Sequence, residues 1–208
     1  MGWNSLLATT SAGWTTNLAC DADASAPNET WTESPGSNEN KPITCETWFE
    51  AYAFCIWDGG FLPSEAEWNY AAAGGAEQRV YPWSSPSTNT TIACSYANYD
   101  PGTWCVAAEP NDVGSESPSG DGLYGQADLI GNAWEWALDW YAGYVTPCVD
   151  CASVTQGSAS ARVLRGVGFD SAPGVGGAPV DVLPVSERTS SIPSVRYSDR
   201  GARCARSP

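Results

Sequence analysis

Apolar side chains recur at helical spacing most clearly in residues 44–58 (TCETWFEAYAFCIWD). Four of them stand at i, i+4, i+7 and i+8: Trp48, Tyr52, Cys55 and Ile56. Positions with this spacing share one face of an α-helix. The pair Gly59-Gly60 follows, and glycine readily adopts the left-handed conformation that ends many helices. The pattern predicts a helix that buries this face.

A capping box predicts a second helix directly after the first. Ser64 is followed three residues later by Glu67, so that each side chain can bond the backbone N–H at the other position. Pro63 precedes the box, and the run EAEWNYAAA then ends at a second Gly-Gly pair, residues 74–75. We expect the two helices to form a compact pair.

The remaining segments have weaker patterns. Residues 1–41 are polar and are expected to be irregular, and residues 81–131 are rich in the turn formers Pro, Gly, Asn, Asp and Ser. Short strands are expected at 133–140, 162–166 and 202–206. The fold class that follows is α+β with little regular secondary structure and long loops. No internal repeat or second domain is visible, so residues 1–208 are taken as a single domain.

Charge and one missing residue type exclude several classes of function. The chain has 24 acidic and nine basic residues, a formal net charge of −15, so nucleic acid and anionic membranes are poor partners. Clustered carboxylates would instead suit hard cations such as calcium. There is no histidine, which removes Ser-His-Asp and Cys-His nucleophile pairs and histidine-ligated zinc, iron or copper.

Eight cysteines are present, an even number without repeated metal-ligand spacing. This usage is typical of disulfides formed in an oxidising compartment. The CxxC pair Cys148 and Cys151 is either a structural staple or a redox pair. We favour the staple, because no thioredoxin-like βαβ pattern surrounds it.

No stretch approaches the roughly 20 apolar residues that cross a bilayer. Met1 to Gly13 has neither the basic start nor the sustained apolar run of a signal peptide. We therefore expect an extracytoplasmic or secreted protein without membrane insertion, whose targeting segment lies upstream or was removed.

Five segments resemble, in order and spacing, the formylglycine-generating enzyme or sulfatase-modifying factor family. The two most specific are WFEAYAFCIWDGGFLPSEAEWNYAAAGG (48–75) and GLYGQADLIGNAWEWALDWY (122–141). The others are YPW (81–83), RVLRG (162–166) and GARCAR (201–206). The resemblance runs from about Pro42 to Arg206. The early strand of the family is not recognisable in residues 1–41, which points to a truncated start.

The resemblance implies a variant of the C-type lectin fold, with few short strands, two helices, and long loops ordered by calcium and disulfides. For the true enzymes it implies copper-dependent oxidation of a sulfatase cysteine to formylglycine. Other branches include iron-dependent sulfoxide synthases, bacterial proteins without known chemistry, and receptors whose C-terminal segment is diversified by retroelements.

The matched positions argue against the oxidase chemistry. In the oxidising enzymes two closely spaced cysteines follow an RGGSW-like strand and bind copper as thiolates. Here that strand reads RGVGF (165–169), and no cysteine follows until Cys204. Cys204 matches a structural position that the family bonds to the cysteine of the first helix, here Cys55. We expect no copper site and no catalytic residue.

The family's calcium site combines an acid or amide, two backbone carbonyls and a glutamate around the GNAWE turn. The matching positions are Asp128, Gly131, Ala133 and Glu135. Two carboxylates with carbonyls make an oxygen cage for a hard cation, so calcium is the expected structural cofactor. The alternative is ordinary surface carboxylates without a metal.

The resemblance also implies the disulfide Cys55–Cys204. Elimination and proximity then leave three pairs: Cys20–Cys45, Cys94–Cys105 and Cys148–Cys151.

In the family, residues 167–200 line the ligand-facing surface. Ligand contacts are therefore expected from four residues: Arg188, Arg196, Tyr197 and Arg200. The alternative is an irregular loop without special function. The Trp134, Trp136 and Trp140 cluster could stack on sugars, but packing within the protein is favoured.

The favoured interpretation is a non-catalytic, calcium-stabilised, extracytoplasmic module that binds an unknown protein, peptide or glycan. One alternative is a divergent oxidoreductase acting on protein cysteine. Another is a retroelement-diversified C-type-lectin-like receptor with a variable C-terminal segment. The ligand and the oligomeric state are not predicted.

Overall fold

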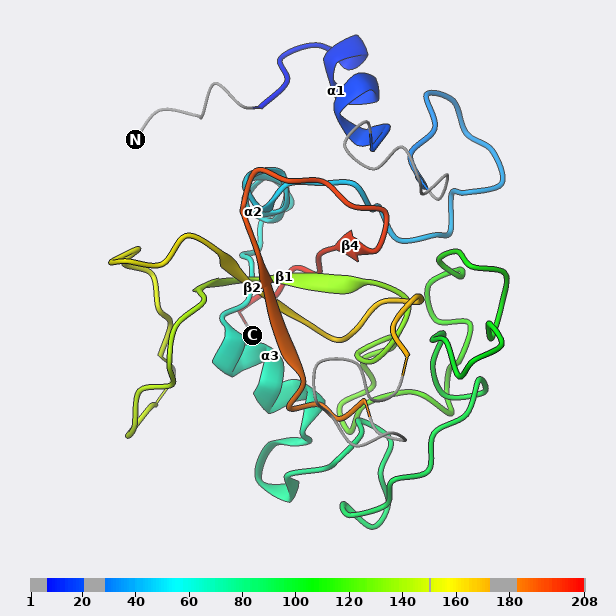
Figure 1. The fold of residues 1–208 in the computed structure, drawn as a ribbon, viewed down its shortest axis with the longest axis vertical. Coiled ribbons are helices and arrows are strands. Elements are labelled where there is room, and N and C mark those ends of the chain that lie inside the picture. Colours follow the sequence, from blue (N-terminus) through cyan, green and yellow to red (C-terminus); the bar gives the residue numbers. More distant parts are fainter. Residues whose placement is uncertain (1–6, 21–28, 150, 173–182, 208) are drawn as a thin grey trace.

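A computed structural model describes residues 7–20, 29–149, 151–172 and 183–207 (Figure 1). Its helices are α1 (Ser11–Leu18), α2 (Trp48–Trp57), α3 (Glu65–Ala72) and the short 3-10 helix η1 (Gly75–Glu77). Its strands are β1 (Trp134–Trp140), β2 (Arg162–Arg165), β3 (Arg188–Ser191) and β4 (Arg200–Gly201). Long loops connect these elements, which confirms the α+β prediction with little regular secondary structure.

Capping boxes start both predicted helices. At α3, Ser64 N–H donates to Glu67 Oε2 at 2.7 Å, and the Ser64 hydroxyl accepts from Glu67 N–H, as the sequence predicts. At α2, Thr47 and Glu50 form an equivalent box, which was not among the predictions from the sequence. These reciprocal bonds satisfy N–H groups that have no partner inside the helix.

The predicted buried face of α2 is only partly correct. Trp48 and Cys55 are buried, but Tyr52 and Ile56 are 39% and 47% exposed. Ala51 is buried in their place, and it packs with Trp48 and Cys55 in one apolar cluster. The buried face of α2 therefore comprises Trp48, Ala51 and Cys55, at positions i, i+3 and i+7. This face packs against β1 and carries the disulfide to Cys204.

The sheet has the strand order β3-β2-β1-β4. β1 pairs antiparallel with β2, which pairs antiparallel with β3, and β4 runs parallel to β1. The strand expected at 202–206 was wrong: pairing occurs at Arg200–Gly201, and Ala205 forms only an isolated bridge with Phe61. β3 was missed because its sequence, RTSS, has no apolar alternation.

Helices α2 and α3 lie on opposite sides of β1 and β2 (Figure 1). Trp136 of β1 packs with Trp48 of α2, whereas the neighbouring Glu135 receives a hydrogen bond from Trp68 of α3. Successive side chains of a strand alternate between its faces, so this one strand anchors both helices. Trp68 in turn belongs to a second apolar cluster, which includes Leu129.

Residues 1–41 were expected to be irregular, and within the described part this was wrong for α1. The Thr10 hydroxyl accepts from Gly13 N–H and begins that helix. Just after α1, Cys20 is joined to Cys45, which precedes α2.

All four predicted disulfides are present, and the chain has no free cysteine. Cys55–Cys204 spans 149 residues and ties α2 to the C-terminal segment. Four disulfides indicate an oxidising, extracytoplasmic environment. Across the described ranges, none of the helices has both the length and the apolarity to cross a bilayer.

Candidate functional site

The GNAWE turn, which carries the predicted calcium ligands, is fixed by its backbone. Asp128, Gly131 and Asn132 have φ values of 54°, 87° and 69°. A Cβ on Gly131 would lie 2.5 Å from the Asn98 carbonyl oxygen, so only glycine fits there. Gly131 N–H donates to the Gly166 carbonyl at 2.7 Å, and Asn132 N–H donates to the Asn98 carbonyl at 2.8 Å. The turn is thus locked to two neighbouring segments.

Glu135, at the start of β1, is buried and already paired. Its Oε2 accepts from Trp68 Nε1 and from Arg203 Nε, each at 2.6 Å, and Arg203 Nη2 donates to Oε1. Arg203 Nη2 also donates to the carbonyls of Ala127 and Asp128. This bidentate pair ties the C-terminal segment to the turn and compensates the buried charge.

Asp128 is the second acid at the turn, and it is half-buried. Burial raises the pKa of its carboxyl group, the Gly114 N–H and Arg203 lower it, and Glu135 and Asp121 raise it again. Gly114 N–H donates to Oδ2 at 2.7 Å. The Arg203 guanidinium therefore offsets both the buried Glu135 and the half-buried Asp128, and the Gly114 N–H also stabilises the Asp128 carboxylate.

This donor set fits a hard cation in its chemistry, because it combines the Asp128 and Glu135 carboxylates with the carbonyls of one turn. A bound calcium ion would share Glu135 with Arg203. In the described part of the chain, no three acidic or cysteine side chains come together as a metal site, so the carbonyls of Gly131 and Ala133 would have to complete the ligand set. Calcium at these four residues stays a prediction.

Arg188, at the start of β3, is the first of the predicted ligand-surface residues. It forms a bidentate pair with Glu65, at 2.8 Å for Nε–Oε1 and 2.7 Å for Nη2–Oε2. Nη1 donates to the Ala142 carbonyl, and the guanidinium lies against the rings of Tyr141 and Tyr144. Its charge is satisfied within the chain.

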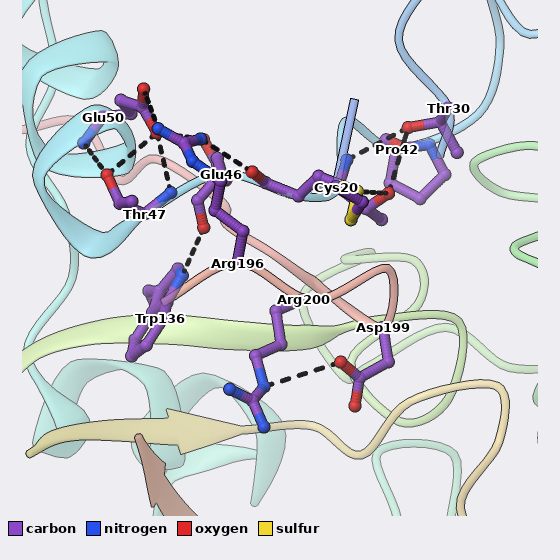
Figure 2. The surroundings of a disulfide bond; sticks show 12 residues. Cys20, Thr30, Pro42, Glu46, Thr47, Glu50, Trp136, Arg196, Asp199 and Arg200 are labelled. Atoms are coloured by element: carbon purple, nitrogen blue, oxygen red, sulfur yellow. Dashed lines mark hydrogen bonds and ion pairs between the residues drawn. A yellow bond between two sulfur atoms is a disulfide. The ribbon is translucent and has the colours of Figure 1, made fainter. Parts of the chain in front are cut away.

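Arg196 and Arg200 come from one segment near the Cys20–Cys45 disulfide, and their side chains point in opposite directions (Figure 2). Arg196 donates to both carboxylate oxygens of Glu50 at 2.6 and 2.7 Å, and to the Cys45 carbonyl. Arg200 donates to Ser191 Oγ and lies 3.7 Å from the centre of the Tyr197 ring. The structure gathers Arg196, Tyr197 and Arg200 on one segment and places Arg188 apart, against α3. Their role in ligand binding stays a prediction.

The carboxylates near the start of α3 have structural partners. Glu67 completes the capping box, and Glu65 pairs with Arg188 and lies 3.8 Å from Arg165. Neither carboxylate is arranged with the other as an acid–base pair.

The comparison with protein-family models decides the family. Residues 3–208 match the sulfatase-modifying factor enzyme 1-like domain. The chain belongs to this family. The match includes most of residues 1–41, in which the motifs of the family are not recognisable.

Curated relatives of the sulfatase-modifying factor family include active and inactive proteins. The formylglycine-generating enzyme of Thermomonospora curvata is 31% identical over 191 residues, which are 85% of this chain and 60% of that enzyme. The inactive C-alpha-formylglycine-generating enzyme 2 of Bos taurus is 30% identical over 170 residues, covering 79% of this chain and 50% of the relative. The chain thus spans 60% of the first relative and half of the second, and family membership alone does not decide activity.

Solved structures support the fold assignment. Treponema denticola variable protein 1 superposes with a TM-score of 0.64 at 24% identity, covering 96% of this chain and 82% of that one. PvdO from Pseudomonas aeruginosa gives a TM-score of 0.59 at 19% identity, covering 83% and 62%. At these identities the likeness shows the sulfatase-modifying-factor-like fold alone.

Within this sulfatase-modifying factor domain, Glu46 is a site that sequence reasoning missed. Burial, reinforced by Glu50 and opposed by Arg196, raises the pKa of its carboxyl group to about 8. Arg196 is committed to Glu50 and to a backbone carbonyl, while the Glu46 main-chain oxygen accepts from Trp136 Nε1 (Figure 2). The sequence gives no local signal for this, because the segment that bonds the backbone of Cys45 and Trp48, around residues 193–197, lies far away along the chain.

The β1 tryptophans are packing residues, as favoured from the sequence. Trp136 is fully buried. The Arg162 guanidinium lies between the rings of Trp48 and Trp140, 3.7 and 3.8 Å from their centres. Burial lowers the pKa of Arg162 to about 10, and the nearby Asp139 opposes this shift. Trp136 therefore has no surface open to a ligand, and Arg162 covers one face of the Trp140 ring.

Proposed function

We propose that this sulfatase-modifying-factor-like domain is a non-catalytic, calcium-stabilised binding module of an extracytoplasmic compartment. The observation that carries the proposal is the pairing of all eight cysteines. A cysteine binds metal and acts as a nucleophile as the thiolate, which a disulfide does not provide. The chain has no histidine to replace it as a ligand for a redox metal.

The rival oxidoreductase would need a reduced cysteine pair, and the CxxC pair Cys148 and Cys151 is the obvious candidate. These residues are bonded to each other in the β1–β2 connection. No apolar cluster of the described chain contains either residue, as is expected of a loop staple.

Oxygen uptake with a cysteine-containing peptide and added copper tests the proposal. We expect no copper-dependent consumption of oxygen above the rate of a mixture without protein. Sustained uptake that stops when Cys148 and Cys151 are both replaced by Ser would establish the oxidoreductase instead.

The calcium part of the proposal rests on Asp128 and Glu135 with the carbonyls of Gly131 and Ala133. Asp128 and Glu135 lie close enough that Glu135, after burial, helps to raise the pKa of the Asp128 carboxyl group, although the Gly114 N–H and Arg203 oppose the shift. A divalent cation would supply the missing positive charge and cross-link the turn.

The diversified-receptor alternative receives less support from residues 183–200. Leu183 and Val185 are core residues, and Arg188 and Arg196 hold buried glutamates. Substituting one member of such a pair leaves an uncompensated buried charge. Free variation at these positions would therefore cost the domain its stability.

A further inference from the structure

The β1–β2 connection extends from the body as a two-limbed loop (Figure 1). Where it leaves the sheet, Trp140 N–H donates to the Ser153 carbonyl and Tyr141 N–H donates to the Ala161 carbonyl, each at 2.8 Å. The buried Asp139 accepts from Ser153 N–H at 2.6 Å and, with its other oxygen, from Glu65 N–H at 2.7 Å. The base of the loop is therefore fixed to the sheet and to α3.

An open groove of about 600 Å³ lies between this loop and β3. Hydroxyl and amide side chains dominate its polar lining: Ser153, Thr155, Gln156, Ser158, Ser160 and Ser190. The other lining residues are Tyr141 and small alanines and glycines, which allow a ligand to approach the backbone closely. No charged residue lines the groove, although the chain carries a formal charge of −15.

Tyr141 supplies an aromatic ring at the edge of this groove. Contacts within the protein fix the position of this ring before a ligand binds. Tyr141 is 40% exposed, and the Arg188 guanidinium lies over one face of its ring, 4.3 Å from the ring centre. Arg188 is itself clamped by Glu65 and bonded to the Ala142 carbonyl. A ring that is already ordered costs little entropy when a ligand stacks on it.

We propose that this groove binds a neutral carbohydrate, with Tyr141 as the stacking platform and the serine and threonine hydroxyls as hydrogen-bond partners. A sugar presents an apolar C–H face to an aromatic ring and many hydroxyls to a lining of donors and acceptors. Charged ligands find no ion-pair partner among the lining residues. Purely apolar ligands would desolvate the hydroxyls without compensation.

The inference rests on the proposed role as a binding module and names the class of its ligand. Its test titrates the oxidised chain of residues 1–208 with maltohexaose, cellohexaose and a linear mannohexaose at millimolar concentration, followed by saturation-transfer NMR. We expect at least one sugar to bind saturably. Tyr141→Ala should weaken that binding by about tenfold, and Ser158→Trp should abolish it by filling the groove.

Three controls separate the groove from the rest of the surface. Tyr141→Phe keeps the ring and should keep the binding, and Tyr124→Ala removes an exposed tyrosine that stacks elsewhere, on Tyr70. Near-UV circular dichroism checks that each variant is folded. Sugar binding that survives both Tyr141→Ala and Ser158→Trp would overturn the assignment of the groove.

Failure of this inference can be told apart from failure of the proposed function. If none of the three sugars binds, or if peptides from a random library bind here instead, the carbohydrate assignment is wrong and the non-catalytic module stands. Copper-dependent oxygen uptake would instead remove the proposed function, whatever the sugars do.

Discussion

Glu46 and Glu50 show how two buried carboxyl groups four residues apart can act in opposite directions on stability. Glu50 is paired by Arg196 and closes the capping box of α2. Glu46 lies beside the same guanidinium without such a pair, and burial raises its pKa to about 8. The folded state therefore holds the Glu46 proton more tightly than the unfolded state does.

The sign of the pH effect follows from that difference. Between pH 4.5, the ordinary pKa of this group, and about pH 8, the folded chain binds more protons than the unfolded chain at Glu46. The contribution of Glu46 to stability therefore falls as the pH rises through this window. Below it, Glu46 is protonated in both states and the effect disappears.

Replacing Glu46 by Gln removes the loss of stability that the buried, ionised carboxylate causes at high pH. We expect Glu46→Gln to raise the free energy of unfolding at pH 8 by up to about 4 kcal/mol, and to change it little at pH 4. Urea unfolding at the two pH values measures both numbers. The matched variant Glu50→Gln should lose about 3 kcal/mol at pH 8, because Arg196 is left without its buried partner. A stabilisation by Glu46→Gln that is equal at both pH values would contradict this assignment.

At the scale of elements, local signals in the sequence were enough to place α2, α3, β1 and β2. The Ser64–Glu67 box and the alternation in 133–140 depend only on near neighbours, so they were readable. β3 was not readable, because its four polar residues form a strand only through their pairing with β2. The buried face of α2 was misjudged for a related reason, since the packing of β1 and the disulfide to Cys204 select it.

The candidate site was predictable as a set of positions but not as a set of contacts. The GNAWE turn pointed to Asp128 and Glu135, and the structure places both at that turn. The turn motif gave no sign that Arg203, 68 residues further along the chain, would pair with the Glu135 carboxylate. The partners of Arg188 and Arg196 lie 123 and 146 residues away, so no local pattern could reveal them.

Calcium binding is the prediction that belongs to this turn. Calcium should raise the melting temperature of the wild-type chain above its value in EDTA by roughly 5–10 °C at saturating concentration. Asp128→Ala should abolish most of this increment by removing one carboxylate ligand. The control Asp112→Ala, which removes an exposed acid nearby, should retain it. Equal melting temperatures with calcium and with EDTA in the wild-type chain would contradict calcium binding at the turn. The charges of Asp128 and Glu135 would then be compensated by Arg203 without a metal.

At the scale of the whole molecule, disulfides and ion pairs connect the elements across long distances in the sequence. Cys55–Cys204 joins α2 to the C-terminal segment, and Arg203, next to Cys204, holds the start of β1. A cross-link that closes so long a loop strongly restricts the unfolded chain. The four disulfides also leave no free thiol in the chain. An oxidase of this family would need such thiols to bind its metal.

The count of free thiols tests that claim most directly. The measurement is the intact mass of the denatured protein after alkylation, without and with prior reduction. We predict no alkyl group before reduction and eight after it, since all eight cysteines are paired. Two alkylated cysteines before reduction would contradict the account, and their positions would identify the thiol pair of an active enzyme.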